Sequence, residues 1–422
     1  MNLLEELGWR EALYDHTEGL PEALASDPLS AYVGFDPTAV SLHVGSLLPV
    51  MGLARLQRAG HTPIALVGGG TGLIGDPSGK AHERQLLNKE KVEENAQGIR
   101  RQLSRFLDFE AQSNPAQMVN NADWLAEVAL VDFLREVGKH FTVNAMMAKE
   151  SVKRRIGQEE GITYTEFSYM LLQSYDFVVL NDRLGCTLQM GGSDQWGNIT
   201  SGIDLLRRMR GKRAYGMVFP LVASSSGVKF GKTEAGAVWL DPEMTSPYRF
   251  YQFWLNSGDD DVVTYLKYFT WLTRQEIDGL ESDLELAPEK RQAQRRLARE
   301  VTRMVHGQTE CANAELASEV LFGGQIEGLN AQQVEDIFSD VPSSELEAEA
   351  LNRGILLTEV LAKSGLASSK GEARRLIQGG GIYLNNRRVT DVKGQARRQD
   401  CIEGRFLVLR KGSKNYHLLR AK

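Results

Sequence analysis

The sequence has few cysteines and no long apolar run, and both absences exclude classes of protein. Its only cysteines, Cys186, Cys311 and Cys401, stand far apart and form no Cys-x-x-Cys pair, so neither a zinc knuckle nor a disulfide framework is indicated. No run of about 18 or more apolar residues could form a membrane-spanning helix. The N-terminal Met-Asn-Leu-Leu-Glu-Glu lacks the basic and then apolar layout of a signal peptide. We therefore expect a soluble, reduced, cytoplasmic protein.

Length and charge indicate several domains with different partners. Single hydrophobic cores stop growing at roughly 250–300 residues, so a chain of 422 residues should form two or three domains. Residues 353–422 hold 16 Lys and Arg against 5 Asp and Glu, a net charge of +11, whereas the whole chain carries −6 and the remainder therefore −17. Such a basic module is typical of contact with a polyanion. A basic surface without a partner is the alternative.

The first two hundred residues alternate apolar segments with helical ones. Residues 31–35 and 63–67 are predicted strands, and residues 47–59 carry apolar side chains at helical spacing before Gly60. A strand, a helix and a strand in this order predict a parallel sheet, and thus an α/β, Rossmann-like domain. Ligands bind such sheets at the carboxyl ends of the strands. The loops that follow Phe35 and Val67 are therefore the expected site.

Composition also predicts the domain boundaries. Residues 1–222 should form the Rossmann-like catalytic domain, and residues 223–322 a loop followed by an α-helical domain. Residues 323–352 contain seven acidic residues and no Lys or Arg, which indicates a linker. Residues 353–422 should form a small α+β domain, with helices at 356–366 and 370–378 and strands at 382–384 and 406–409.

Two motifs suggest phosphate chemistry. The first, residues 41–46 (Ser-Leu-His-Val-Gly-Ser), lies between a predicted strand and a helix start, where free backbone N–H groups suit phosphate; we call it the histidine motif. The second, residues 227–233 (Gly-Val-Lys-Phe-Gly-Lys-Thr), presents two lysines around a glycine, and we call it the lysine loop. Mobile ammonium groups can hold a pyrophosphate leaving group. Alone, each motif could equally be a capped helix or a solvated turn.

Taken together, these motifs resemble the two signatures of class I aminoacyl-tRNA synthetases. A third segment, residues 67–80 (Val-Gly-Gly-Gly-Thr-Gly-Leu-Ile-Gly-Asp-Pro-Ser-Gly-Lys), could be mistaken for a dinucleotide fingerprint, but Pro77 and Lys80 break the expected helix. It closely resembles a loop of bacterial tyrosyl-tRNA synthetases. Segments 32–38, 166–176 and 191–199 are similar to other motifs of that family, in the same order. The resemblance covers essentially the whole chain.

The resemblance implies site residues, which we carry over one by one. Those expected to bind tyrosine are Tyr32 and Asp176 at the hydroxyl group, Asp76, Tyr169 and Gln173 at the α-ammonium group, and Gln195 near the carboxylate. Those expected to bind ATP are Gly34, Asp36, Gly45, Ser46, Gly192, Asp194 and Lys232. Those expected to act on its phosphates are Thr38, His43, Lys80, Arg84, Lys229, Lys232 and Thr233.

The physical logic of the residues agrees with these roles. Tyr169, Gln173 and Asp176 are spaced i, i+4 and i+7, so a helix would place all three on one face. An ordinary helix with a polar face is the alternative. A buried carboxylate is costly without a partner, and a ligand ammonium or phenol group supplies one. The usual final His of the first signature is Ser46 here, and the second reads Lys-Phe-Gly-Lys-Thr rather than Lys-Met-Ser-Lys-Ser.

The basic C-terminal module resembles an S4 domain, a small RNA-binding fold. Lys370, Arg374 and Arg375 would form a stripe on one helix that suits RNA phosphates. The family implies two steps: tyrosine attacks the α-phosphate of ATP, and the adenylate then acylates the terminal ribose of tRNA(Tyr). ATP is a substrate accompanied by Mg²⁺, and no protein-bound metal or organic cofactor is expected. A homodimer without membrane contact is implied.

Three other functions are open. A tryptophanyl enzyme of the same fold is disfavoured by Tyr32 together with Asp176, because an indole has no hydroxyl group to meet them. An RNA-binding protein that has lost catalysis is disfavoured by the intact lysine loop. A dinucleotide-dependent oxidoreductase built on residues 68–75 is the weakest alternative.

Overall fold

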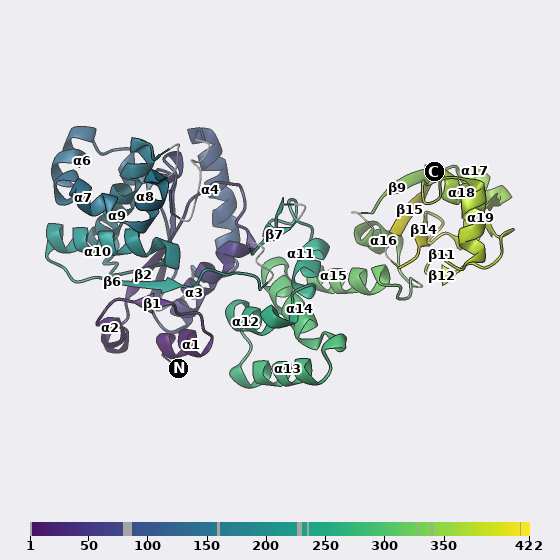
Figure 1. Cartoon of the computed structure of the whole chain (residues 1–422), viewed down its shortest axis with the longest axis horizontal. Helices are drawn as coiled ribbons and strands as arrows, with labels where there is room; N and C mark the ends of the chain where they lie inside the picture. Colours follow the sequence, from purple (N-terminus) through teal and green to yellow (C-terminus); the bar gives the residue numbers. More distant parts are fainter. Residues whose placement is uncertain are drawn as a thin grey trace. The chain divides into compact units, whose positions relative to one another are not determined.

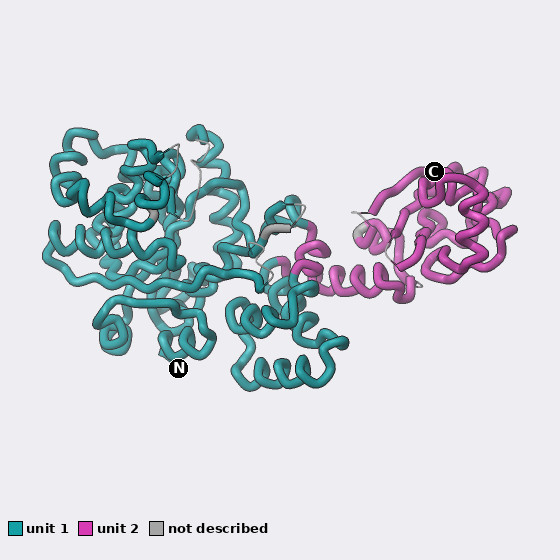
Figure 2. The backbone as a smooth tube through the Cα atoms, viewed as in Figure 1, with its two compact units in different colours: residues 1–245, 254–305 teal, residues 246–253, 306–422 magenta. Residues whose placement is uncertain are grey.

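The computed structural model describes residues 2–78, 87–157, 161–225, 230–233, 236–326, 328–338, 341–413 and 415–422. The chain forms two compact units (Figure 2): residues 1–245 with 254–305, and residues 246–253 with 306–422. Within the described ranges, no helix combines the length and the apolar character needed to cross a membrane.

The larger unit is built on a six-stranded sheet (Figure 1). Its spatial order is β1 (Asp15–His16), β6 (Tyr215–Phe219), β5 (Leu188–Gly192), β2 (Ser30–Phe35), β3 (Thr62–Val67) and β4 (Gln117–Asn120). All neighbours are parallel except β1 and β6. β2 and β3 pair in register from Ser30 opposite Thr62 to Phe35 opposite Val67. The predicted strand–helix–strand unit is confirmed, with α3 (Leu47–Arg58) between these strands.

Sequence-local signals explain the helices that border the sheet. The longest, α9, begins after Thr163, whose hydroxyl accepts from the backbone N–H of Glu166, and ends at Gly185 in a left-handed conformation. Besides α9 (Tyr164–Leu184) and α3, the described helices of the α/β body are α1 (Leu3–Trp9), α2 (Leu20–Ser26), α4 (Lys89–Leu103), α5 (Ala122–Leu125), α6 (Leu130–Glu136), α7 (Val143–Met147), α8 (Glu150–Ile156) and α10 (Trp196–Arg210).

The order of the strands creates a crevice at one edge of the sheet. β2 and β5 are neighbours, but the chain leaves β2 through α3 towards β3 and leaves β5 through α10 towards β6 on the opposite side. Loops at the carboxyl ends of two such strands diverge, and ligands bind between them. The site expected after Phe35 therefore lies at a topological switch point.

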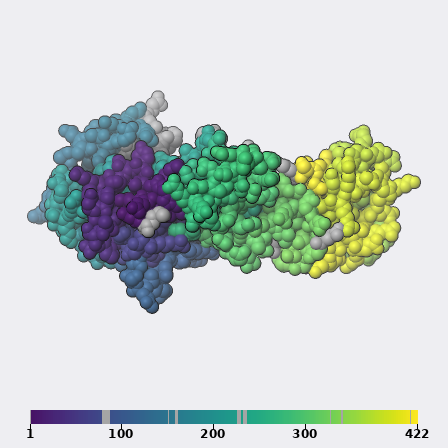
Figure 3. All heavy atoms as spheres, turned by 90° about the horizontal axis from the view of Figure 1, so that it is seen from below, coloured from purple at the N-terminus to yellow at the C-terminus, as the bar shows by residue number. Residues whose placement is uncertain are grey.

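A helical region follows the α/β body in sequence, as predicted within residues 223–322. Its helices are α11 (Pro247–Leu255), α12 (Asp259–Phe269), α13 (Arg274–Leu286), α14 (Gln292–His306) and α15 (Gln308–Leu321). The N-terminal residues border α12 and α13 in the larger unit (Figure 3), where Arg10 Nη1 donates to the carbonyl oxygen of Lys267 at 3.0 Å. Arg55 Nη2 of α3 donates to the carbonyl oxygen of Tyr268 at 2.8 Å. These arginines bind the carbonyl end of α12, where positive charge is favourable.

The smaller unit contains a five-stranded sheet. Its order is β12 (Arg387–Arg388), β11 (Ile382–Leu384), β14 (Phe406–Lys411), β15 (Asn415–Ala421) and β9 (Ser343–Leu346). Both predicted helices are present, as α18 (Leu357–Lys363) and α19 (Lys370–Gln378). The predicted domain boundaries stay a prediction, but the acidic segment 323–352 is not bare linker. It supplies β9 and α16 (Ala331–Ile337), because Val334, Ile337 and Phe338 are apolar enough to be buried in the core.

Candidate active site

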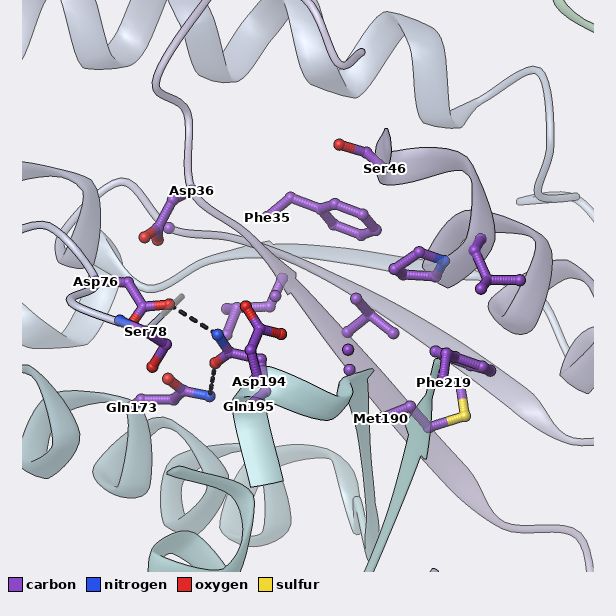
Figure 4. A pocket seen from close by; sticks show the side chains of 18 of the residues that line it. Phe35, Asp36, Ser46, Asp76, Ser78, Gln173, Met190, Asp194, Gln195 and Phe219 are labelled. Carbon is purple, nitrogen blue, oxygen red and sulfur yellow. Dashed lines mark hydrogen bonds between the residues drawn. The ribbon is translucent and has the colours of Figure 1, made fainter. Parts of the chain in front are cut away.

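The loops that follow β2, β3, β5 and β6 enclose a cavity of about 360 Å³. Figure 4 shows Asp36, Asp76, Gln173 and Gln195 gathered on one side of it, with Met190 and Phe219 on the other. The predicted site residues among its lining are Tyr32, Gly34, Asp36, Thr38, His43, Gly45, Ser46, Asp76, Tyr169, Gln173, Asp176, Gly192, Asp194 and Gln195. Cavities of this size commonly bind small ligands.

The remaining predicted residues are not placed in the cavity. Lys80, Arg84 and Lys229 lie outside the described residues, and of Lys232 and Thr233 only the backbone is described, as strand β7 (Lys232–Thr233). Lys370, Arg374 and Arg375 belong to the smaller unit, where all three are exposed on α19.

Helix α9 presents its predicted polar face to the cavity. Tyr169, Gln173 and Asp176 all line it, as their spacing predicts. Asp176 is 1% exposed, and its carboxylate accepts hydrogen bonds from Asn121 Nδ2 at 2.9 Å and Trp124 Nε1 at 2.7 Å. Burial raises the pKa of Asp176 to about 7, although these two donors lower it. A carboxylate has about four acceptor positions, so two remain for a ligand.

Tyr32 also lines the cavity, close enough to Asp176 to feel its charge. Tyr32 is fully buried, and its oxygen has no hydrogen-bond partner among the described residues. Burial, and then the charge of Asp176, raise the pKa of Tyr32, so the phenol keeps its proton. An unsatisfied buried hydroxyl group costs about 1–3 kcal/mol. A ligand that brought a hydroxyl group here would give Tyr32 its missing partner.

Two hydrogen bonds from neighbouring side chains hold Asp36 in place. Its two oxygens accept hydrogen bonds from Thr71 Oγ1 at 2.9 Å and Tyr169 OH at 3.0 Å. Burial and the charges of Asp36 and Asp76 raise the pKa of Tyr169, which keeps it a donor. Gly68 is required beside this carboxylate, because a Cβ atom there would stand 2.2 Å from Asp36 Oδ1.

A network of amide side chains lies beside Asp76. Gln195 Nε2 donates to Asp76 Oδ2 at 2.8 Å, and Gln195 Oε1 accepts from Gln173 Nε2 at 3.3 Å. Asn198 Nδ2 donates to Gln173 Oε1 at 2.9 Å and lies 3.2 Å from Ser78 Oγ. The network fixes which atoms of Gln173 and Gln195 are donors and which are acceptors.

The histidine motif is shaped by its own backbone. Gly45 N–H donates to His43 Nδ1 at 3.0 Å, so a neutral His43 carries its proton on Nε2. A Cβ atom on Gly45 would lie 2.7 Å from the His43 ring. Glycine is therefore needed here to let the histidine fold back, a reason that the sequence did not suggest.

The histidine motif is also joined to the segment that follows the lysine loop. Val44 N–H donates to the Val238 carbonyl oxygen at 3.0 Å, and Leu240 N–H to the Leu42 carbonyl oxygen at 2.9 Å. The rings of His43 and Trp239 meet edge to face, with centroids 6.0 Å apart. Residues 42–44 and 238–240, nearly 200 positions apart in sequence, thus share one small antiparallel ladder.

Two glycine positions bear on where a flat or phosphate-bearing ligand could lie. Gly34 is exposed within β2, and a Cβ atom there would meet nothing nearer than Leu66 Cδ2 at 4.0 Å, so a flat ligand can lie against the strand. In the glycine run that begins at Gly68, by contrast, backbone N–H groups are bonded within the protein. Gly69 N–H donates to Asn120 Oδ1 at 3.1 Å and Gly70 N–H to Asn121 Oδ1 at 2.7 Å. Their N–H groups are already bonded, which contradicts a dinucleotide phosphate cradle.

Several residues that hold the site residues in place were not predicted from the sequence. Asn121 and Trp124 hold Asp176, Thr71 holds Asp36, and Asn198 orders the amide network. One signal was available for Asn121, which directly follows β4, because polar residues at strand carboxyl ends face the site. Nothing in the sequence points to the pairing of Trp124 with a carboxylate 52 residues further along.

Comparisons with known proteins agree with this geometry. The family described as "tRNA synthetases class I (W and Y)" matches residues 24–323, and "Tyrosine--tRNA ligase SYY-like C-terminal domain" matches residues 333–419. A tyrosine–tRNA ligase of Roseiflexus castenholzii is 58% identical over 99% of both chains. One from Bacillus caldotenax is 53% identical over the full length of both.

A solved structure extends the likeness to the fold. The C-terminally truncated mitochondrial tyrosyl-tRNA synthetase of Aspergillus nidulans is 29% identical, with a TM-score of 0.69 over 76% of this chain and 94% of that chain. Family, full-length relatives and fold agree: the chain belongs to the class I aminoacyl-tRNA synthetases, in the tyrosine–tRNA ligase family.

Proposed function

We propose that the chain activates L-tyrosine with ATP and transfers it to the terminal ribose of tRNA(Tyr). One observation carries the tyrosine assignment. Two buried carboxylates, those of Asp76 and Asp176, line the cavity, and no Lys or Arg is among its described lining residues. Buried carboxylates need a partner, and the ammonium group of an amino acid supplies a cation. Beside Asp176, Tyr32 lacks a hydrogen-bond partner within the described chain, which suits a phenol substrate.

The roles of the tyrosine-binding residues follow from their contacts. The substrate hydroxyl group would donate to Asp176 and meet Tyr32. The α-ammonium group would bind Asp76, Tyr169 and Gln173, and its carboxylate would lie near Gln195. Asp36 keeps the Tyr169 hydroxyl group oriented, so it supports both this subsite and the neighbouring nucleotide.

The opposite end of the cavity suits ATP. Gly34, Gly45, Ser46, Gly192 and Asp194 would receive the nucleoside, and Thr38 and His43 would face the phosphates, with His43 Nε2 as a donor. Lys80, Arg84, Lys229, Lys232 and Thr233 would hold the departing pyrophosphate. Magnesium would arrive on the phosphates of ATP, which are its usual ligands. No group of three or more His, Cys, Asp or Glu residues in the described part of the chain offers it a further site.

The chemistry then needs mainly positioning and charge stabilisation. A tyrosine carboxylate oxygen bonds to the α-phosphorus, and the bond from that phosphorus to the β-phosphate oxygen breaks, which releases pyrophosphate. A hydroxyl group of the terminal ribose next attacks the tyrosyl carbonyl carbon, and AMP leaves. His43 and the lysines stabilise negative charge that builds up in the first step, so no nucleophilic side chain is required.

The proposal also includes tRNA binding and the formation of a homodimer. The exposed stripe of Lys370, Arg374 and Arg375 on α19 would bind tRNA phosphates in the cytoplasm. A homodimer would cover a group of exposed apolar side chains on α6 to α9, namely Leu130, Val131, Leu134, Val143, Met147, Ile156 and Tyr164. In that case Val131→Glu should yield monomers in analytical ultracentrifugation, whereas Leu286→Glu, an exposed apolar position on α13, should not.

The test of the proposed function is amino-acid-dependent exchange between ATP and labelled pyrophosphate, with each of the twenty amino acids. Exchange should require tyrosine. Exchange supported by tryptophan would favour the tryptophanyl alternative, and none with any amino acid would favour an RNA-binding protein without catalysis.

A further inference from the structure

The first turn of α12 binds the chain just before the lysine loop. Ser225 N–H donates to Asp261 Oδ1 at 3.0 Å, Ser225 Oγ donates to Asp261 Oδ2 at 3.1 Å, and Ser224 Oγ lies 3.4 Å from the same oxygen. One turn further along, Tyr265 OH donates to the carbonyl oxygen of Ala223 at 3.4 Å. Three consecutive residues, 223–225, are thus bound to one helix, and the carboxylate of Asp261 is the acceptor for two of them.

The same helix binds the chain within the lysine loop, after the four residues 226–229 that lie outside the described ranges. Phe230 is 8% exposed and stacks on Phe269, with centroids 5.6 Å apart and planes 6° apart. Its ring also lies 5.0 Å from that of Tyr265. Since α12 spans Asp259–Phe269, it contacts the chain on both sides of Lys229.

α12 and the lysine loop are both attached to the part of the fold that carries the histidine motif. Gly231 has φ of +77°, and a Cβ atom there would lie 2.7 Å from Val44 Cγ2 of that motif. At its other end, α12 is bound by Arg55 of α3, the helix that begins directly after the motif. Movement of α12 relative to α3 would therefore change where Phe230 and Gly231 lie relative to the histidine motif.

We propose that Asp261 is a positioning residue for the first step of the reaction. Through its bonds to Ser224 and Ser225, it holds the lysine loop in register with His43. The inference rests on the proposed role of Lys232 and Lys229 at the pyrophosphate. Ordering a loop costs conformational entropy, and bonds to a charged acceptor are about twice as strong as neutral ones. A displacement of about 1 Å can cost about 10²-fold in rate.

The experiment compares Asp261→Ala with Asp260→Ala, using the full-length chain. Asp260 is a matched control, because it is exposed in the same helical turn and has an equal charge near the helix dipole. Asp261→Ala should lower kcat for tyrosine-dependent pyrophosphate exchange by roughly 10- to 100-fold, with KM for tyrosine within about twofold. Asp260→Ala should change neither by more than about twofold.

The second half-reaction separates positioning from a general loss of structure. Transfer of tyrosine from preformed adenylate to tRNA occurs after pyrophosphate has left, so Asp261→Ala should leave its rate unchanged. Asp261→Asn should restore part of the first step, because its amide oxygen can still accept from Ser225 N–H. In a double-mutant cycle, Asp261→Ala should cost far less in a Lys232→Ala background, since both act through one loop.

Each outcome has a distinct meaning. The inference would be overturned if Asp260→Ala and Asp261→Ala lost equal activity, or if Asp261→Ala slowed both half-reactions equally. It would also be overturned if Asp261→Ala kept full activity while Lys232→Ala was slow. Full activity in Lys232→Ala would instead remove the proposed role of the loop. Should Asp261→Ala fail to fold, Ser225→Ala and Asp261→Asn test the same contacts, and unchanged kcat in both would refute the proposal.

Discussion

Replacing Tyr32 by Phe should make the ligand-free protein more stable while making the enzyme less selective. The Tyr32 oxygen is buried and has no hydrogen-bond partner among the described residues. Removing it therefore breaks no hydrogen bond and abolishes the desolvation cost of the hydroxyl group. That cost is about 1–3 kcal/mol, and the free energy of unfolding should rise by a similar amount.

The effect on substrate choice has the opposite sign. In the tyrosine complex, the Tyr32 hydroxyl group should bond to that of the substrate, and a neutral hydrogen bond contributes about 0.5–1.5 kcal/mol. The preference for tyrosine over phenylalanine in kcat/KM should therefore fall by roughly 2- to 13-fold. Asp176 remains in this variant, so most discrimination should survive. Pyrophosphate exchange with both amino acids measures the preference, and denaturant unfolding without ligand measures the stability.

A matched control is available in Tyr416→Phe. That buried hydroxyl group has partners, since it donates to the Val320 carbonyl oxygen at 3.0 Å and lies 3.0 Å from Asn386 Oδ1. Tyr416→Phe should therefore destabilise the smaller unit by about 0.5–1.5 kcal/mol. If Tyr32→Phe were destabilising to the same extent, the Tyr32 hydroxyl group would be satisfied in the free enzyme and the reasoning would fail.

The remaining predictions concern charge, catalysis and the C-terminal module. Because the folded pKa of Asp176 is raised from 3.8 to about 7, the folded state binds the extra proton. The contribution of Asp176 to stability is therefore greatest below pH 3.8 and falls by up to about 1.4 kcal/mol per pH unit as the pH rises to 7. Unfolding at several pH values should show this loss as the difference between the wild type and Asp176→Asn. Asp176→Ala should reduce the preference for tyrosine over phenylalanine by roughly 10- to 150-fold, for loss of a bond to a charged group; an unchanged preference would place the hydroxyl site elsewhere. His43→Ala should slow adenylate formation by an amount equal to roughly 2–4 kcal/mol, with little change in KM for tyrosine, and a loss confined to that KM would contradict its role at the phosphates. Removal of residues 323–422 should preserve tyrosine activation and abolish most tRNA charging. Removal of residues 353–422 should instead misfold residues 323–352, because β9 would lose its partner strand β15. If the chain without residues 323–422 still charged tRNA with an unchanged KM, the RNA-binding assignment would be refuted.

Local patterns were sufficient to predict some of the elements that carry the site, although not β5 or β6. The apolar run at 31–35, the helical spacing at 47–59 and the second run at 63–67 correspond to β2, α3 and β3, because backbone periodicity is encoded by neighbouring residues. Tyr169, Gln173 and Asp176 face the cavity together for the same reason. The acidic stretch 323–352 was harder to interpret. Its charge suggested a linker, but a few apolar residues were enough to bury α16 in the core.

The α/β class, the order of the motifs and the basic C-terminal module follow from the sequence alone, since each depends on residue type and short-range spacing. The resemblance to a family supplied many of the residues that line the cavity. The groups that hold these residues in place could be known only from the fold. Asn121 and Trp124 reach Asp176, Thr71 reaches Asp36, and residues 238–240 pair with the histidine motif. Those contacts join residues 35 to nearly 200 positions apart. Which residues meet in these contacts depends on how strands and helices pack in space, and no local pattern in the sequence predicts that packing.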